Sequence, residues 1–328
     1  TGGNECDLTF VFNATPSAGV GTWTRTSGPG TATFTPGAND PHATAVVSSY
    51  GTYIFTWTEV NGACSNSNTV TVNFYQQPVS NAGTGGSECD LNFSLHATPS
   101  VGTGLWTRTG GTGTAVFGNA SMAVTTVTVS AYGTYVFNWT ETNGTCSDAS
   151  SVIVDFNEDP VLITSAAGPD QNICGLSATM AGTAHNYLAS PNDHSGSTRA
   201  WSQVSGPGTA SFTSPDSPVS PVSVNVYGVY TFRWTETNGT CTRSDEMVID
   251  FNEEPVLITN AAGPDQNVCG NSTSMAATAH SYTPAPNDHA GSTRVWSRIS
   301  GPGTATFASP SSPASTVTVT VYGVYVFQ

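Results

Sequence analysis

The chain has 328 residues, only 9 % of them charged, and a formal net charge of −15 at pH 7. All seven basic residues are arginine, so no lysine is present for a Schiff base or a phosphate-binding loop. So acidic a chain is poorly suited to nucleic-acid phosphates or anionic lipid, and no apolar run reaches the ~20 residues that span a bilayer. We therefore expect no nucleic-acid partner and no membrane insertion.

The composition indicates a soluble all-β protein. Glycine and proline contribute 34 and 20 residues, while aromatic residues still make up 10 %. Many turn formers together with Trp and Tyr are typical of short strands rather than of disorder. No segment carries apolar residues at the 3.6-residue period of a helix, so almost no helix is expected.

Taken in chain order, the sequence is a series of four repeats. A tryptophan followed by a Gly-rich turn and Thr-Ala-x-Phe marks each repeat, beginning at Trp23, Trp106, Trp201 and Trp296. These tryptophans are 83, 95 and 95 residues apart, which is the size of one small sandwich domain. The predicted domains are residues 1–77, 78–158, 159–253 and 254–328, the last lacking its closing strands.

A second marker shows the strand pattern within a repeat. In Tyr-Gly-x-Tyr-x-Phe-x-Trp-Thr-Glu, which starts at Tyr132 in repeat 2, the aromatic residues alternate with polar ones at period 2. One face of this strand is therefore core and the other solvent. The following Asn143-Gly144 predicts a type I′ hairpin turn. Val161–Thr164 and 256–259, after two junction prolines, are expected to form a first strand or to pack across the junction.

The cysteines recur with the repeats. They are Cys6, Cys64, Cys89, Cys146, Cys174, Cys241 and Cys269. Each full repeat has one before its first core strand and one in its Asn-Gly-x-Cys turn, so we expect three in-domain pairs. These are Cys6–Cys64, Cys89–Cys146 and Cys174–Cys241, with Cys269 unpaired and its partner expected just after Gln328. Each bond would add roughly 3–5 kcal/mol and would place the protein in an oxidising, extracellular compartment.

The two markers resemble the PKD-like and immunoglobulin-like repeats of large secreted bacterial surface proteins, especially those of the Bacteroidota. The resemblance covers the whole chain and implies a tandem array of immunoglobulin-like β-sandwiches. Such modules serve as stalks, adhesins, filament subunits and spacers alike. The Tyr-Gly-x-Tyr segment is also similar to a tyrosine corner. Because the cysteines depart from the antibody pattern, an inter-sheet bridge is not implied.

Candidate chemical sites are few. The triplet Asn192-Asp193-His194 recurs as 287–289, which makes Asp193 and Asp288 weak metal candidates. No dense carboxylate cluster accompanies them, so a shared polar loop is the favoured interpretation and no metal or other cofactor is expected. Arg25 and Glu59 are expected to pair beside the buried tryptophans. Every polar feature occurs in copies, unlike a catalytic pocket, so no enzymatic activity is predicted.

Asn-x-Ser/Thr sequons are the most prominent surface feature. They lie at Asn13, Asn92, Asn119, Asn138, Asn143, Asn238 and Asn271. Asn138 is expected on the solvent face of its strand, and Asn143 and Asn238 at hairpin tips where a covalent glycan would fit.

Repetition, proline-limited junctions and disulfides favour a structural subunit of an extracellular fibre or cell-surface stalk, whose partners are copies of itself or neighbouring repeats end to end. One alternative is an adhesin or glycan-binding array, for which Tyr187 and Tyr282 are the candidate loop aromatics. Another is a spacer region of a larger secreted protein.

Overall fold

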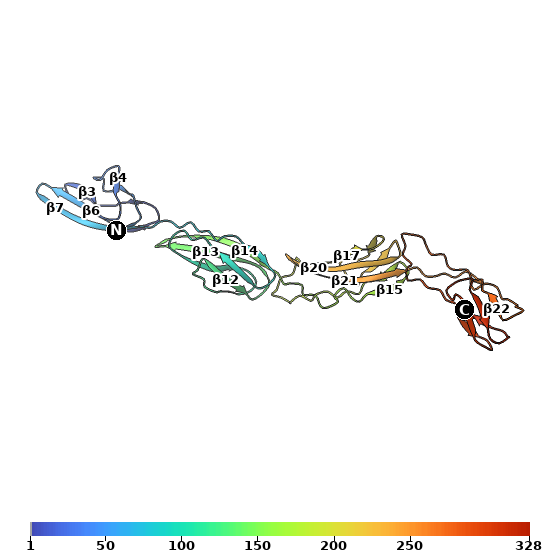
Figure 1. Cartoon of the computed structure of the whole chain (residues 1–328). Coiled ribbons are helices and arrows are strands. Elements are labelled where there is room, and N and C mark those ends of the chain that lie inside the picture. The colour runs from blue at the N-terminus through green and yellow to red at the C-terminus, as the bar shows by residue number, and fades with distance from the viewer. Residues whose placement is uncertain (1) are drawn as a thin grey trace. The chain divides into compact units, whose positions relative to one another are not determined.

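A computed structural model describes residues 2–328 as strands, turns and loops, with no helix in that range. The predicted all-β fold is therefore confirmed. Within residues 2–328, no helix exists that could cross a membrane. Contacts divide the chain into two units: unit 1 runs to Asp159 and includes Tyr187–Ser197 and Asn238–Cys241, and unit 2 holds the remainder. The strands are labelled in Figure 1.

Repeat 1 is a sandwich of two sheets. The four-stranded sheet has the order β1-β7-β6-β3 and the three-stranded sheet the order β2-β5-β4. The strands are β1 (Gly3–Glu5), β2 (Thr9–Val11), β3 (Val20–Ser27), β4 (Ala32–Thr35), β5 (Thr44–Val47), β6 (Gly51–Asn61) and β7 (Cys64–Phe74).

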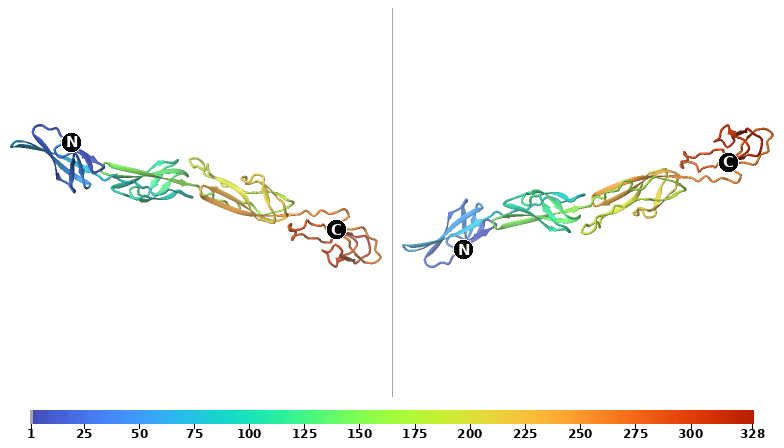
Figure 2. Two further views of the ribbon diagram at one scale, coloured as in Figure 1. Left: turned by 90° about the horizontal axis from the view of Figure 1, so that it is seen from above. Right: turned by 90° about the horizontal axis from the view of Figure 1, so that it is seen from below.

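Repeat 2 has the same topology, with sheets β10-β13-β14-β8 and β11-β12-β9. The long antiparallel pair β13 and β14 is drawn in green in both views of Figure 2. The strands are β8 (Gly86–Glu88), β9 (Asn92–His96), β10 (Thr103–Gly110), β11 (Ala115–Phe117), β12 (Val124–Val129), β13 (Gly133–Asn143) and β14 (Cys146–Phe156).

Repeat 3 is built alike and repeat 4 has five strands. Repeat 3 has sheets β15-β21-β20-β17 and β16-β19-β18, and repeat 4 has β22-β25-β24 and β23-β26. The strands are β15 (Gln171–Cys174), β16 (Ser177–Thr179), β17 (Thr198–Ser205), β18 (Ala210–Phe212), β19 (Pro221–Val224), β20 (Gly228–Asn238), β21 (Cys241–Asn252), β22 (Ser272–Ser274), β23 (Arg298–Ser300), β24 (Ala305–Phe307), β25 (Thr316–Val319) and β26 (Val326–Phe327). The chain is thus a tandem array of immunoglobulin-like β-sandwiches.

Each repeat has its own hydrophobic core between its two sheets. In repeat 2, Tyr135, Phe137 and Trp139 of β13 point inward and are fully buried, as the period-2 pattern predicts. The rings of Trp106 and Trp139 lie 5.3 Å apart, and equivalent tryptophan pairs lie at 5.1 Å in repeat 1 and 5.2 Å in repeat 3. The hydroxyl of Tyr135 donates to the carbonyl of Ala131 at 2.9 Å, which is the hydrogen bond of a tyrosine corner.

Two local expectations fail. Neither Val161–Thr164 nor 256–259 forms a strand, so the first-strand alternative is wrong, and the first strand of repeat 3 is β15 instead. Packing of these segments across the junction stays a prediction. The expected Arg25–Glu59 pair also does not form. The guanidinium of Arg25 donates to the carbonyl of Gly28 in its own turn, because the strand register places Arg25 opposite Phe55 and Glu59 opposite Gly21.

Candidate functional site

The disulfides join consecutive repeats instead of closing within one. Cys6 of repeat 1 is bonded to Cys146 in the hairpin of repeat 2, and Cys89 of repeat 2 is bonded to Cys241 in the hairpin of repeat 3. The predicted in-domain pairs are therefore wrong. The cysteines without a disulfide are Cys64, Cys174 and Cys269, and all three are exposed.

The strand register explains why a repeat does not pair its own two cysteines. In repeat 1, β1 runs parallel to β7 with Glu5 opposite Phe74, so Cys6 lies beside the end of β7. Cys64 begins β7, ten residues earlier, which is about 33 Å along a strand. A disulfide needs Cα atoms within about 7 Å. The two cysteines of a repeat thus lie at opposite ends of one sheet.

The first joint combines this disulfide with a hydrogen bond from the hairpin tip. Cys6 and Cys146 have Cα atoms 5.5 Å apart, and Cys146 is only 1 % exposed. Nδ2 of Asn143 donates to the carbonyl of Gln76 at 2.8 Å. The hairpin tip of repeat 2 is therefore bound to the end of repeat 1 both covalently and through its asparagine.

The second joint repeats this arrangement. Cys89 and Cys241 have Cα atoms 5.6 Å apart, and Cys241 is 2 % exposed. Nδ2 of Asn238 donates to the carbonyl of Glu158 at 3.0 Å. Glu158 follows Phe156 by two residues, as Gln76 follows Phe74, so the asparagine of each tip bonds to the same position on the preceding repeat.

Glycine is required at both tips. Gly144 and Gly239 have φ of 63° and 59°, a region that L side chains rarely adopt. An added Cβ would also lie 2.4 Å from the ring of Tyr75 or the side chain of Asn157, respectively. Only the glycine of each two-residue loop has a positive φ, whereas a type I′ turn needs it at both positions, so the predicted turn type is wrong.

The second joint has an additional contact, made by the segment Tyr187–Ser197 of repeat 3, which we call the clasp loop. The N–H of Tyr132 in repeat 2 donates to Oδ1 of Asn192 at 2.8 Å. The N–H of Asp193 donates in turn to the carbonyl of Tyr132 at 3.2 Å. The clasp loop therefore forms a reciprocal pair of hydrogen bonds with the tyrosine that opens the second marker.

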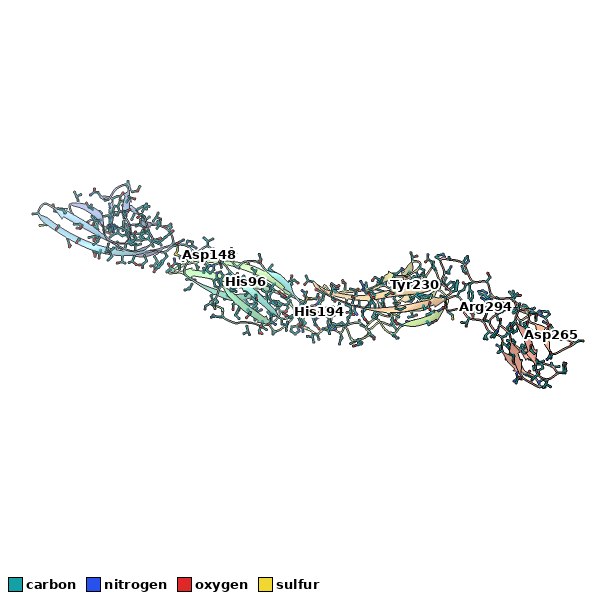
Figure 3. All side chains as sticks on the ribbon, viewed as in Figure 1. His96, Asp148, His194, Tyr230, Asp265 and Arg294 are labelled. Carbon is teal, nitrogen blue, oxygen red and sulfur yellow. A yellow bond between two sulfur atoms is a disulfide. The ribbon has the colours of Figure 1, made fainter. Side chains whose placement is uncertain are left out.

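A glutamate holds the other side of the clasp loop. The carboxylate of Glu158 accepts the N–H of Leu188 at 3.0 Å and lies 3.2 Å from Nε2 of His194. The ring of Tyr187 stacks on His194 at 4.7 Å (His194 is labelled in Figure 3). Tyr187 is thus half-buried, and its ring packs within the loop.

Within unit 2, residues 282–292 of repeat 4 form the same clasp on repeat 3. The N–H of Tyr227 donates to Oδ1 of Asn287 at 2.7 Å, and the N–H of Asp288 donates to the carbonyl of Tyr227 at 3.2 Å. The carboxylate of Glu253 accepts the N–H of Thr283 at 2.8 Å and lies 3.4 Å from Nε2 of His289. The recurring Asn-Asp-His triplet is thus an inter-repeat contact.

The weak metal candidates do not gather ligands. In the part of the chain that the structure describes, no three His, Cys, Asp or Glu side chains are grouped as a metal site. Oδ1 of Asp193 accepts the N–H of Ser195 at 3.0 Å, and Oδ1 of Asp288 accepts that of Ala290 at 2.9 Å. The hydrogen bonds from Ser195 lower the pKa of Asp193. Each aspartate therefore orders its own loop.

A glutamate two residues after the second tryptophan of each full repeat fixes the loop before the third strand of that repeat. In repeat 2, Nε1 of Trp139 donates to Glu141 at 2.9 Å, and the N–H of Ser100 donates to the same carboxylate at 3.0 Å. Burial alone would raise the pKa of Glu141, but the hydrogen bonds from Ser100 and Trp139 outweigh it and lower the pKa. The glutamate therefore remains ionised inside the sandwich.

Repeat 1 shows the same arrangement in a more exposed form. The hydroxyl of Ser17, followed in strength by the indole N–H of Trp57, lowers the pKa of Glu59 to about 2. These three side chains tie the start of β3 to the end of β6. The sequence contains no sign of this role, because the spacing of Arg25 and Glu59 pointed to an ion pair instead.

The asparagines of the seven sequons differ in how far they are exposed to solvent. Asn13, Asn92, Asn119 and Asn271 are exposed, and Asn138 is half-buried on the outer face of β13. The expectation of exposed hairpin tips is wrong for Asn238, which is 2 % exposed, because the tip is buried against repeat 2. Asn143 uses its amide nitrogen in the first joint. Glycosylation of the remaining five stays a prediction.

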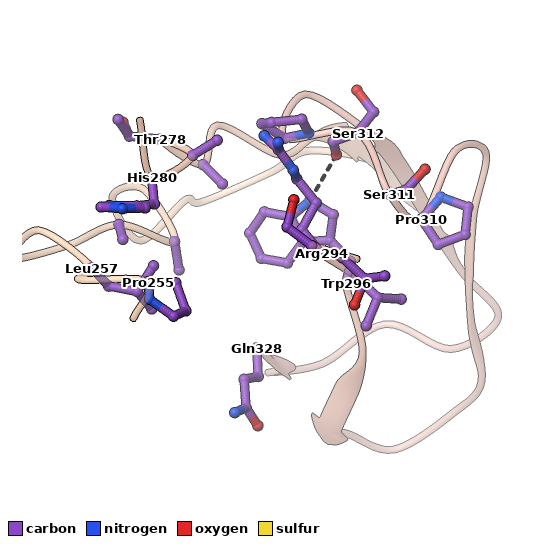
Figure 4. Close-up of a pocket in the computed structure, with 18 of the residues that line it drawn as sticks. Pro255, Leu257, Thr278, His280, Arg294, Trp296, Pro310, Ser311, Ser312 and Gln328 are labelled. Carbon is purple, nitrogen blue, oxygen red and sulfur yellow. Dashed lines mark hydrogen bonds between the residues drawn. The ribbon is translucent and has the colours of Figure 1, made fainter. Parts of the chain in front are cut away.

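Repeat 4 contains an apolar hollow beside Trp296 (Figure 4). Leu257, Ala277 and Pro313 line it, and Nε1 of Trp296 donates to the carbonyl of Ser312 at 3.0 Å. No second tryptophan lies beside Trp296 in residues 2–328, unlike in the other repeats.

The chain is similar to several solved structures at low sequence identity. No family model matches the chain, and no curated protein does. An I-band fragment of titin is 15 % identical, with 77 % of this chain and 95 % of that chain covered and a TM-score of 0.38. Extracellular domains 3–5 of Drosophila OTK are 12 % identical, with 77 % and 94 % covered and a TM-score of 0.39. Strand order and register, rather than these likenesses, define the sandwiches.

Proposed function

We propose that this chain is a structural segment of an extracellular fibre or cell-surface stalk, of the PKD-like type found in secreted bacterial proteins. The observation that carries the proposal is the pairing of Cys6 with Cys146 and of Cys89 with Cys241. A disulfide within one domain stabilises that domain, whereas a disulfide between domains resists their separation. An array of domains under tension needs this resistance to separation.

Four further features support a structural, non-enzymatic role. The two joints use equivalent positions, so the same connection is made twice. The candidate aromatic for glycan binding, Tyr187, stacks on His194 instead of presenting its ring to a ligand. Disulfides form and persist mainly in oxidising compartments, which agrees with a secreted or surface location. Exposed sequons such as Asn92 and Asn119 add positions at which covalent glycans would coat the surface.

Electron microscopy of the native, non-reduced material tests this proposal. We expect filaments whose axial repeat matches an integral number of these sandwiches, with extra density at glycosylated sequons. A non-reduced digest of the same sample is expected to yield peptides linking Cys6 to Cys146 and Cys89 to Cys241. Isolated particles of about four domains at all concentrations would contradict the fibre role.

A matched pair of variants separates the role of the joint from the role of the fold. Removing both partners of the first joint, Cys6→Ser with Cys146→Ser, is expected to give filaments that break under shear while each sandwich stays folded. The control, Ser147→Ala, changes an exposed side chain next to Cys146 and keeps the disulfide, so it is expected to leave the filaments intact. Equal filament strength in both variants would contradict a mechanical role of the joint.

A further inference from the structure

The hairpin tip of repeat 1, Asn61–Cys64, has the features of the two tips that form joints. β6 and β7 pair with Asn61 opposite Cys64, as β13 and β14 pair with Asn143 opposite Cys146. Gly62 has a φ of 60°, within a few degrees of the glycines at the two joined tips. The tip therefore has the sequence and the backbone of a joint without needing any rearrangement.

The surroundings of this tip differ from those of the joined tips. Cys64 and Asn61 are exposed, whereas Cys146 and Cys241 are 1 % and 2 % exposed. A Cβ added to Gly62 meets nothing within 4 Å, whereas one added to Gly144 meets the ring of Tyr75 at 2.4 Å. The burial of a joined tip thus comes from the preceding repeat, and the tip of repeat 1 presents the same groups to solvent.

We propose that this tip binds another repeat of the same kind, and that Cys64 forms a disulfide with the cysteine that follows the first strand of that repeat. The inference rests on the proposed function, since it extends the same joint beyond the four repeats. In both observed joints the partner cysteine follows a short first strand that runs parallel to the last strand of its sandwich. A carbonyl two residues beyond the last strand's phenylalanine accepts the hydrogen bond of the tip asparagine.

This chain itself carries cysteines of the partner type. Cys174 ends β15, which runs parallel to β21, and Cys269 stands at the matching place in repeat 4; both are exposed and free of disulfides. The clasp of repeat 4 already engages Glu253 at the end of repeat 3. This does not block Cys174, because at the second joint a clasp on the Glu158 carboxylate and a tip asparagine on the Glu158 carbonyl occur together, so either cysteine of a second molecule can serve as the partner. A further repeat within the same polypeptide would supply the same chemistry.

The bond forms by thiol–disulfide exchange with a low-molecular-weight disulfide such as oxidised glutathione. The Cys64 thiolate attacks one sulfur of that disulfide and releases one thiolate. The partner thiolate then attacks the sulfur of Cys64 in the mixed disulfide and releases the second thiolate. Two cysteine thiols are oxidised, one small disulfide is reduced to two thiols, and the two protons pass to the released thiolates.

Differential alkylation and mass spectrometry of the native, non-reduced protein test the proposal. We expect Cys64 to resist alkylation until reduction and to appear in a peptide linked to a first-strand cysteine. A link to Cys174 or Cys269, together with a dimer band that runs as monomer on a reducing gel, assigns the partner to a second molecule. A link to a peptide outside residues 1–328 assigns it to a further repeat of the polypeptide. A free Cys64, a Cys64–Cys64 bond or a small-thiol adduct would overturn the proposal.

A variant pair distinguishes a built joint from chance oxidation of an exposed thiol. Asn61→Ala removes the tip amide and is expected to lower the oxidised fraction of Cys64 several-fold in the native host. Ser65→Ala, at the adjacent exposed position of β7, is the control and is expected to leave that fraction unchanged. Equal oxidation in both would overturn the joint. Fibres with a free Cys64 would overturn this inference alone, and a bonded Cys64 without fibres would overturn only the fibre role.

Discussion

The two joints of unit 1 have two contacts in common and differ in a third. Both have a disulfide to a hairpin cysteine and a hydrogen bond from the tip asparagine, Asn143 or Asn238. Only the second also has a clasp loop, which holds Tyr132 and Glu158. Trp106 of repeat 2 follows Thr98 by 8 positions, whereas Trp201 of repeat 3 follows the equivalent Thr183 by 18, so repeat 2 has no room for such a loop. The disulfide and tip are the common connection, and the clasp loop is a second, independent attachment.

Removing a disulfide is expected to open the first joint far more than the second. The bonds close sequence separations of 140 and 152 residues, each contributing about 5 kcal/mol on a chain-entropy estimate. In the double variant Cys6→Ser, Cys146→Ser, we expect hydrogen exchange at residues 143–146 to rise steeply. In Cys89→Ser, Cys241→Ser the clasp loop still holds the repeats, so a much smaller rise is expected. Equal rises would show that the clasp loop contributes nothing.

Trp139→Ala is expected to destabilise repeat 2, which takes part in both joints. The side chain is 1 % exposed at the centre of the repeat 2 core, so its loss is expected to destabilise that sandwich by about 3–5 kcal/mol. Exchange measured by mass spectrometry should rise across residues 78–158 while the core of repeat 1 stays protected. Trp296→Ala, in a core with three buried residues, is the control for tryptophan loss elsewhere. Simultaneous loss of protection in every repeat would contradict independent cores.

Asn192→Ala would affect the second joint alone. It removes the acceptor of the Tyr132 N–H and leaves the disulfide in place, so we expect a loss of about 1 kcal/mol. Faster amide exchange at Tyr132 is the readout. Asn287→Ala makes the same change in unit 2 and is expected to speed exchange at Tyr227 but not at Tyr132. An unchanged rate at Tyr132 would mean that the hydrogen bond does not hold the loop.

Acid is expected to loosen the contact between residues 282–292 of repeat 4 and repeat 3, and to leave the disulfides intact. Burial alone would raise the pKa of Glu253, but hydrogen bonds from Thr283 and His280 and the charge of His289 lower it. Because the folded pKa lies below the ordinary 4.5, the stabilisation is present above that pH and is lost as the pH falls through the lowered value. NMR of the Thr283 amide between pH 6 and 2 would show the release. Glu253→Gln should remove the pH dependence.

The fold was largely predictable, because it depends on local pattern. The alternation around Tyr135 and Trp139 specifies which face of β13 is buried, and the repeat spacing gives the size of each sandwich. The disulfide pairing was not, because it depends on where the short first strand lies. Three residues such as Gly3–Glu5 carry no periodicity, yet their parallel pairing with β7 places Cys6 at the far end from Cys64.

The clasp loops left a signal in the sequence that was interpreted as a shared polar loop, with a metal site as the weaker alternative. Asn192, Asp193 and His194 occur only with the longer loops of repeats 3 and 4. A polar triplet that recurs only in repeats with a longer loop indicates an inter-repeat contact as readily as a ligand site. The partner, Tyr132, lies in the preceding repeat, so no pattern within one repeat reveals the contact.

The two disulfides enclose overlapping stretches of chain, from Cys6 to Cys146 and from Cys89 to Cys241. Any single cut of the backbone between Cys6 and Cys241 therefore leaves the two fragments covalently attached. A cut between Cys89 and Cys146 leaves them attached twice. In surroundings rich in proteases, such a molecule keeps its continuity after being nicked, and only a second cut or a reductant releases a piece.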